Sequence, residues 1–220
     1  MTRRIVAIGG AGMDEPAHTR FLLSQARGGR VCFLPTAGGD DDEHIKSFYV
    51  AFRGCDATHL ELFKRTEQDL RGFLLAQDLI YVGGGNTANL LAIWRVHGVE
   101  AILREAYAAG TLLCGSSAGC ICWFECGITD SFGLGLAPLH DGLGLLAGSA
   151  CPHYDSEARR RPVYTAAVRD GLAAGIALDD AVAARYEDER LVEILSSRLG
   201  ARAFRVDASG EHPLEVRALG

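Results

Sequence analysis

Long apolar runs, extended basic segments and a signal peptide are all missing from this sequence. No stretch approaches 18 uninterrupted apolar residues, so we expect no membrane span. The formal net charge is −6 and the longest run of Lys or Arg is Arg159-Arg160-Arg161, which argues against nucleic acid as the main partner. The chain starts with MTRRIVAIGG, a short strand-like segment that meets glycines, and this is not the pattern of a signal peptide.

Patterns typical of disulfides, metals and nucleotides are missing as well. The seven cysteines are odd in number, and Cys120, Cys122 and Cys126 cluster without C-x-x-C spacing or a nearby histidine. The acidic run over residues 40–43 is expected in the first turn of a helix, not at a metal. The glycines over residues 9–12 lack the spacing of a dinucleotide fingerprint and the lysine of a Walker motif. We predict free thiols in a reducing cytoplasm and neither a metal nor an organic cofactor.

The composition, 48% hydrophobic and 23% charged over 220 residues, is that of an ordinary globular chain. No internal repeat or linker divides it, so a single domain over residues 1–220 is expected. Alternating strand and helix patterns predict an α/β fold with three layers. It comprises a mostly parallel central sheet, helices on both faces and antiparallel strands near the C-terminus. Expected strands cover residues 4–10, 31–34, 59–63, 78–82, 111–114, 150–154, 175–178, 182–186, 191–194 and 203–206; expected helices cover 14–27, 40–52, 67–76, 88–97, 100–109 and 157–173.

The most informative segment is TLLCGSSAG, residues 111–119. Its first four residues predict a buried strand, and the GSSAG that follows has the G-x-S-x-G pattern of a nucleophile elbow centred on Ser117. The next segment, CICWFEC, is expected to continue as an apolar helix. The helix start behind Ser117 would supply free N–H groups that can hold an oxyanion. The alternative is a glycine-rich turn whose serines only cap a helix.

A second glycine turn, Gly83-Gly84-Gly85-Asn86-Thr87, follows the strand expected at residues 78–82. Three glycines before a helix let backbone N–H groups approach a ligand, which suits an oxyanion hole or an anion nest. A plain strand-to-helix turn is the alternative. Both glycine turns would lie at the carboxyl ends of parallel strands, so we expect them to face one pocket. Residues 127–148, rich in glycine and leucine, are expected to form a long loop beside it.

A serine nucleophile needs a base and a group that orients this base. His153 is the best placed of the seven histidines, because it follows Pro152 at the end of an apolar segment; His140 is the second choice. The residue pattern leaves the acid open. The order serine, acid, histidine would favour Asp130 or Asp141, whereas a position at a strand end favours Asp179 or Asp180. The full set of candidate acids is Glu125, Asp130, Asp141, Asp179 and Asp180.

The GGGNT turn, the G-x-S-A-G elbow and the Pro152-His153 pair, at these separations, resemble the peptidase E (aspartyl dipeptidase) family. Cyanophycinases share the pattern, and the fold is similar to that of class I glutamine amidotransferases. The resemblance covers about residues 1–195. It implies Ser117 as nucleophile, His153 as base, and an oxyanion hole from the N–H groups of Gly85 and Ala118. Leu178-Asp179-Asp180 matches the family's acid pattern and points to Asp180, although the family usually has glutamate there; Asp130 is the alternative or an auxiliary group.

The resemblance also implies an arginine that receives an acidic substrate side chain, and Arg159 stands nearest to its position. Arg160 and Arg161 could replace it, and a solvated helix face is the alternative. Substrate or oxyanion binding is therefore assigned to Gly84, Gly85, Asn86, Ala118, Asp130 and Arg159. The expected function is a cytoplasmic serine peptidase, with no metal, that cleaves short peptides, including dipeptides with N-terminal Asp, and forms a homodimer. One alternative is an amidohydrolase or acyl-transfer enzyme of glutamine amidotransferase type. In such enzymes a cysteine usually occupies the elbow, where this chain has Ser117, and Cys114 and Cys120 are close to it in sequence. The other alternative is a non-catalytic small-molecule-binding relative.

Overall fold

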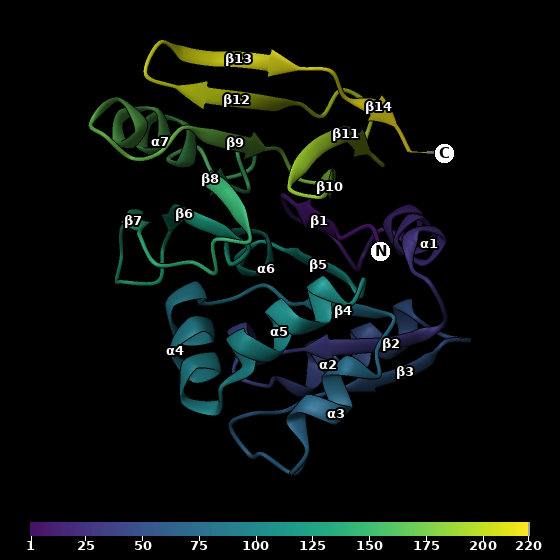
Figure 1. The fold of residues 1–220 in the computed structure, drawn as a ribbon. Coiled ribbons are helices and arrows are strands. Elements are labelled where there is room, and N and C mark those ends of the chain that lie inside the picture. The colour runs from purple at the N-terminus through teal and green to yellow at the C-terminus, as the bar shows by residue number, and fades with distance from the viewer. Residues whose placement is uncertain (220) are drawn as a thin grey trace.

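An eight-stranded sheet forms the centre of the protein, which a computed structural model describes over residues 1–219 (Figure 1). The strand order is β14-β11-β10-β1-β5-β4-β2-β3, in which the five strands from β1 to β3 are parallel, and β10 runs antiparallel to β1. The strands are β1 (Arg4–Ile8), β2 (Arg30–Leu34), β3 (Asp56–His59), β4 (Leu79–Val82), β5 (Leu112–Ser116), β10 (Val182–Glu187), β11 (Arg190–Ser196) and β14 (Arg217–Ala218).

Helices cover both faces of this sheet because its strands are apolar on both sides. Along β1, for example, Ile5 packs into one core and Val6 into the other. The first core includes residues of α3 (Leu70–Leu75), α4 (Thr87–His97) and α5 (Val99–Ala108), and the second includes residues of α1 (Pro16–Gln25) and α2 (Asp42–Ala51). A 3₁₀ turn, η1 (Thr36–Gly38), follows β2. The expected α/β fold with a mostly parallel central sheet and helices on both faces is thus confirmed.

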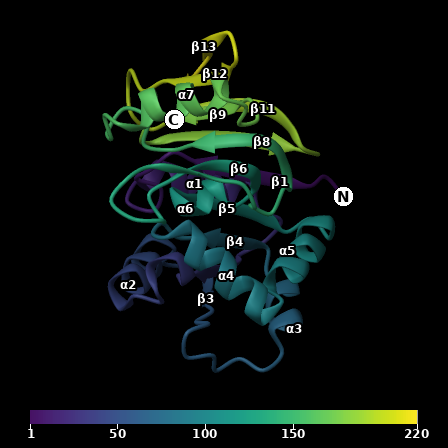
Figure 2. The same cartoon turned by 90° about the vertical axis from the view of Figure 1, so that its left-hand side faces the viewer.

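A second sheet of six strands was not predicted. Its order is β13-β12-β9-β8-β6-β7, with β6, β8 and β9 parallel. Helix α7 (Arg160–Arg169) packs on one face of this sheet, and the other face joins the core of the central sheet. Figure 1 and Figure 2 both show β12, β13 and α7 at the opposite end of the molecule from α2, α3 and β3. The strands are β6 (Phe124–Thr129), β7 (Ala137–Leu139), β8 (Leu146–Cys151), β9 (Gly175–Leu178), β12 (Ala203–Asp207) and β13 (Gly210–Leu214).

Two sequence predictions in the middle of the chain were wrong, and both concern this second sheet. The apolar helix expected after Ser117 is only one turn, α6 (Ala118–Ile121), because the chain enters β6 at Phe124. The long loop expected over residues 127–148 contains the end of β6, all of β7 and the start of β8. Strand β6 pairs in parallel with β8, and β8 pairs with β9, so many of their hydrogen bonds come from tertiary context that local composition does not reveal.

Several element bounds also differ from the prediction. The strand expected at 59–63 lies earlier, at β3, which is an edge strand with a weak apolar pattern. The strand expected at 150–154 ends at Cys151, so His153 lies in the turn behind it, and the helix expected at 157–173 is the shorter α7. The antiparallel strands expected at 182–186, 191–194 and 203–206 correspond to β10, β11 and β12. No helix within residues 1–219 is both long enough and apolar enough to cross a membrane.

Candidate active site

Ser117 lies in a strained turn between β5 and α6. Its backbone has φ 57° and ψ −112°, a conformation that non-glycine residues rarely adopt. The Ser117 N–H donates to the carbonyl of Ile8 at 3.1 Å, which fixes the turn to the end of β1. A Cβ at Gly119 would lie 2.2 Å from the Val82 carbonyl oxygen, so the backbones pack too closely for any side chain. The geometry is that of the predicted elbow.

His153 reaches this serine from the turn after β8. The residue has φ 54°, and its N–H donates to the carbonyl of Gly9 at 3.2 Å. Its Nε2 lies 2.8 Å from the Ser117 Oγ, and its Nδ1 lies 2.7 Å from Oδ1 of Asp180, the second residue after β9. The side chains of His153 and Asp180 are 21% and 23% exposed. The three groups therefore form a continuous hydrogen-bonded chain that substrate and water can reach.

Of the five candidate acids, only Asp180 meets the imidazole. Asp179 is buried and its Oδ2 accepts the Arg202 N–H at 2.8 Å. The other three carboxylates do not contact the imidazole: Glu125 accepts the Gly148 N–H, Asp141 pairs with Arg95, and Asp130 lines a cavity between the segment after β6 and the start of α7. His140, the second candidate base, is exposed after β7.

The glycine turn after β4 lies against the serine. A Cβ at Gly84 would be 3.3 Å from the Ser117 Cβ, and Gly85 has φ 133°. The N–H groups of Gly85 and Ala118 donate to no acceptor within residues 1–219. Asn86 does not present a free side chain: its Oδ1 caps α4 by accepting the Asn89 N–H, and its Nδ2 donates to the Ser131 carbonyl. The turn can thus offer backbone donors, while Asn86 ties it to the segment after β6.

A cavity of about 350 Å³ is formed by two segments that are linked to the glycine turn and to His153. Its walls are the segment after β6 and the residues that lead into α7: Asp130, Gly133, Leu134, Gly135, Leu136, Glu157, Ala158 and Arg159. The Asn86–Ser131 hydrogen bond joins one wall to the glycine turn, and the Glu157 N–H, which donates to the His153 carbonyl, joins the other wall to His153. The exposed Arg159 lies across from Gly135.

The neighbouring arginines cannot replace Arg159 in this cavity as they stand. Arg160 is 3% exposed, and its guanidinium donates to the Ile128 carbonyl and pairs with Glu157. Arg161 pairs with Glu211 on β13. Among the three basic residues, therefore, Arg159 alone lines the cavity.

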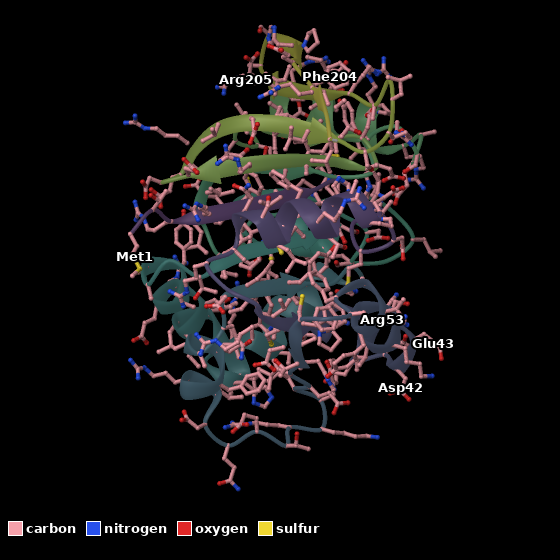
Figure 3. All side chains as sticks on the ribbon, turned by 90° about the vertical axis from the view of Figure 1, so that its right-hand side faces the viewer. Met1, Asp42, Glu43, Arg53, Phe204 and Arg205 are labelled. Carbon is pink, nitrogen blue, oxygen red and sulfur yellow. The ribbon has the colours of Figure 1, made fainter. Side chains whose placement is uncertain are left out.

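Thiols and acidic clusters do not enter the candidate site. Cys114 and Cys120 are fully buried, and burial raises the pKa of both thiols, so neither is poised to act as a thiolate nucleophile. Asp42 and Glu43 lie at the edge of the molecule in the first turn of α2 (Figure 3). No group of three or more metal-ligating side chains lies close enough within residues 1–219 to hold an ion.

Two residues of the site were not singled out from the sequence. A Cβ at Gly10 would lie 2.1 Å from the Asp180 Oδ1 and 2.7 Å from the His153 ring, so the hydrogen-bonded pair of Asp180 and His153 needs glycine there. The glycine run after β1 is the sequence signal for this close packing, although by its composition it suggests a nucleotide loop with incomplete spacing. Asp155 accepts the Asp180 N–H at 2.8 Å. No local pattern indicates this contact, because its partners are 25 residues apart.

Comparison with known proteins gives one consistent result. The model of peptidase family S51 matches residues 5–194. The uncharacterized peptidase YgaJ of Bacillus subtilis is 44% identical over 99% of this chain and 100% of its own. A crystal structure of a peptidase from an acI-B1 Actinobacterium has a TM-score of 0.73 at 18% identity, covering 98% of this chain and 95% of that one. The resemblance to the peptidase E family is confirmed: the chain belongs to peptidase family S51 and is a serine-type peptidase.

Proposed function

We propose that Ser117, His153 and Asp180 form the catalytic triad of this peptidase. The observation that carries the proposal is the pair of hydrogen-bond distances, 2.8 Å from Oγ to Nε2 and 2.7 Å from Nδ1 to Oδ1. His153 takes the hydroxyl proton as Ser117 attacks the scissile carbonyl, and Asp180 stabilises the imidazolium. The imidazolium then gives its proton to the leaving amine, and water, activated by His153, hydrolyses the acyl-enzyme.

The oxyanion that forms during attack is held by the backbone N–H groups of Gly85 and Ala118. Both groups lack an acceptor in the described chain, and both belong to turns that meet at Ser117. Gly84 leaves room for the substrate carbonyl, because any side chain there would contact the nucleophile. Donors fixed in the backbone need no reorganisation when charge develops, which is what makes such a hole effective.

The substrates we propose are short peptides, including dipeptides with N-terminal Asp. Arg159 and Asp130 carry opposite charges in the same cavity. The Arg159 guanidinium suits an acidic side chain, and the Asp130 carboxylate suits the free α-ammonium group of the same residue. A cavity that recognises a free amino terminus restricts cleavage to the first peptide bond, which favours dipeptides and other short chains.

The test is the hydrolysis of Asp-Leu, Ala-Leu and Gln-Leu by the wild type and by Ser117→Ala, Arg159→Met and Arg161→Met. We expect cleavage of Asp-Leu that is abolished in Ser117→Ala and reduced at least tenfold in kcat/KM by Arg159→Met. Arg161→Met is the matched control, because Arg161 pairs with Glu211 outside the cavity, and it should stay within about threefold.

Different outcomes separate the parts of the proposal. Wild-type turnover by Ser117→Ala would refute the serine mechanism. Equal cleavage of Asp-Leu and Ala-Leu, with no effect of Arg159→Met, would leave the triad and refute the acid-binding role of Arg159. Labelling of Ser117 by a fluorophosphonate probe without cleavage of any of the three dipeptides would refute the proposed substrate while retaining the nucleophile.

A further inference from the structure

The carboxylate of Asp155 joins the loop of the base to the loop of the acid. Asp155 stands two residues after His153, and its Oδ1 accepts the Asp180 N–H at 2.8 Å. Its Oδ2 accepts a hydrogen bond from the guanidinium of Arg198, on the segment after β11. One side chain therefore holds the backbone of the residue whose own carboxylate orients the imidazole.

The charge of Asp155 is stabilised by these contacts. Partial burial raises the pKa of its carboxyl, but the Asp180 N–H and the Arg198 guanidinium together lower the pKa below its ordinary value. Asp155 is consequently an anion at neutral pH, with both oxygens engaged by donors. An anion that bridges two donors is a more rigid link than a neutral acceptor would be.

The acid loop needs such a link because Asp180 sits in a tight turn. The next residue, Ala181, has φ 64°, and its N–H donates to the Gly10 carbonyl at 3.0 Å. Asp180 has one methylene group between backbone and carboxylate, so a shift of its backbone moves Oδ1 by a similar amount. Displacing Oδ1 by 1 Å would lengthen the 2.7 Å hydrogen bond to Nδ1 beyond its useful range.

We propose that Asp155, held by Arg198, is a positioning residue that fixes the backbone of Asp180 and thereby the orientation of His153. The inference rests on the proposed triad. It also gives a role to a residue outside the part of the chain that the family model matches, because Arg198 follows residue 194. Asp155 contacts neither the nucleophile nor the cavity beside Arg159 among the hydrogen bonds and cavity walls described, so its effect on the reaction passes through Asp180.

The experiment compares Asp155→Ala with Asp155→Asn in the full-length protein. Four quantities are measured: the rate at which a fluorophosphonate probe labels Ser117 across pH 5–9, kcat on the best dipeptide, KM for the same dipeptide, and the downfield ¹H signal of the His153 Nδ1 proton. We expect Asp155→Ala to slow labelling and lower kcat by about 10- to 100-fold, with KM within threefold and the downfield signal shifted or lost. Asp155→Asn keeps an oxygen for the Asp180 N–H, so we expect it to restore the rate to within about fivefold of wild type.

Two further variants keep the test decisive. Arg205→Ala is the matched control, because Arg205 is an exposed arginine on β12 that forms no ion pair with Asp155, and it should leave all four quantities unchanged. If Asp155→Ala fails to fold, Arg198→Ala replaces it, since the Arg198 side chain is 45% exposed and the substitution creates no cavity in the core. A three- to tenfold loss in Arg198→Ala with a shifted proton signal would then support the inference.

The inference and the triad fail in different ways. Wild-type turnover in Ser117→Ala overturns the proposed triad itself. Loss of activity in Ser117→Ala, together with wild-type labelling, turnover and proton signal in Asp155→Ala, overturns only the positioning role of Asp155.

Discussion

The central sheet and the second sheet contribute to the candidate site in different ways. From the central sheet come Ser117 and the glycine turn after β4, both held by backbone contacts in the core. From the second sheet come His153, after β8, and Asp180, after β9, and the acid is held in part by the Asp155 side chain. The half of the site around Ser117 is thus fixed mainly by close backbone packing, whereas the half around Asp180 depends in addition on charged side chains near solvent.

This difference predicts which substitutions will disturb the geometry of each half of the site. The nucleophile turn is anchored mainly through its backbone, by the Ser117 N–H on the Ile8 carbonyl, with one side-chain contact from the Tyr81 hydroxyl to the Ser116 Oγ. The acid–base pair depends on contacts that single substitutions can remove. Changes around Ser117 should therefore act almost entirely through the chemistry of that residue, whereas changes around His153 should act through its geometry.

The largest effect is expected from removing the reacting groups themselves, either Ser117 in one half of the site or the Asp180 carboxylate in the other. If the three groups act as a unit, Ser117→Ala should lower kcat about 10⁶-fold and Asp180→Asn about 10⁴-fold. The double variant should be no less active than Ser117→Ala alone, because a base without its nucleophile contributes nothing. Steady-state kinetics on the best dipeptide measures all three variants.

Asp179→Asn is the matched control for the acid. Asp179 is adjacent in sequence and buried, but its Oδ2 accepts the Arg202 N–H and not a proton of the base. We expect activity within a few-fold of wild type. A loss as large as that of Asp180→Asn would mean that the two aspartates had been assigned the wrong roles.

The sequence predicted the central sheet far better than the second sheet, for a physical reason. Strands β1, β2, β4 and β5 are short apolar runs closed by glycine or proline, a pattern that specifies a buried parallel strand locally. Strands β6 and β8 each contain a glycine and an exposed residue, and β7 is a three-residue strand with a proline. The parallel pairing of β6 with β8 joins segments that are separated in sequence, so local composition does not reveal it.

The same distinction explains which site residues could be predicted. Ser117 and Gly85 each belong to a motif of five contiguous residues, so the local sequence is enough to identify them as candidates. The choice of Asp180 among five acids needed the family resemblance, because its contact with His153 spans 27 residues. Asp155 and Gly10 could not be identified, since each acts on a segment remote in sequence.

A glycine after the first strand of the central sheet contacts the residues that the second sheet contributes to the site. Gly10 follows β1, in the central sheet, but a Cβ there would overlap the Asp180 carboxylate and the His153 ring. Gly10→Ala should force the acid–base pair to move and lower kcat about 100-fold, although no reacting group is removed. Labelling of Ser117 by the fluorophosphonate probe should slow by a similar factor.

Gly29→Ala provides the control for adding a methyl group to a glycine near a strand. A Cβ at Gly29 has no neighbouring atom within 4 Å, and the residue does not have a positive φ. Activity should be unchanged. Equal activity of Gly10→Ala and wild type would show that the acid–base pair tolerates displacement, which would contradict the geometric sensitivity inferred for that half of the site.

The smallest expected effect is on the stability of the fold, through the buried imidazole of His18. His18, on α1, is fully buried, and both ring nitrogens lack a hydrogen-bond partner within the described residues. Burial lowers the pKa of His18 below 6.5, and the charge of Glu15 opposes this only in part. Below pH 6.5 the unfolded chain therefore binds a proton that the folded protein rejects, so stability falls as pH decreases towards the lowered pKa.

The slope of this loss is at most about 1.4 kcal/mol in the free energy of unfolding for each pH unit. His18→Leu removes the titrating group, so the urea midpoint of this variant should rise relative to that of the wild type as pH falls from 7 to 5. At pH 8, where His18 is neutral in both states, the two proteins should differ only by the change in packing. His44→Leu is the control, because His44 is exposed on α2. If His18→Leu and wild type keep a constant difference from pH 8 to pH 5, the imidazole is protonated equally in both states and burial does not govern its charge.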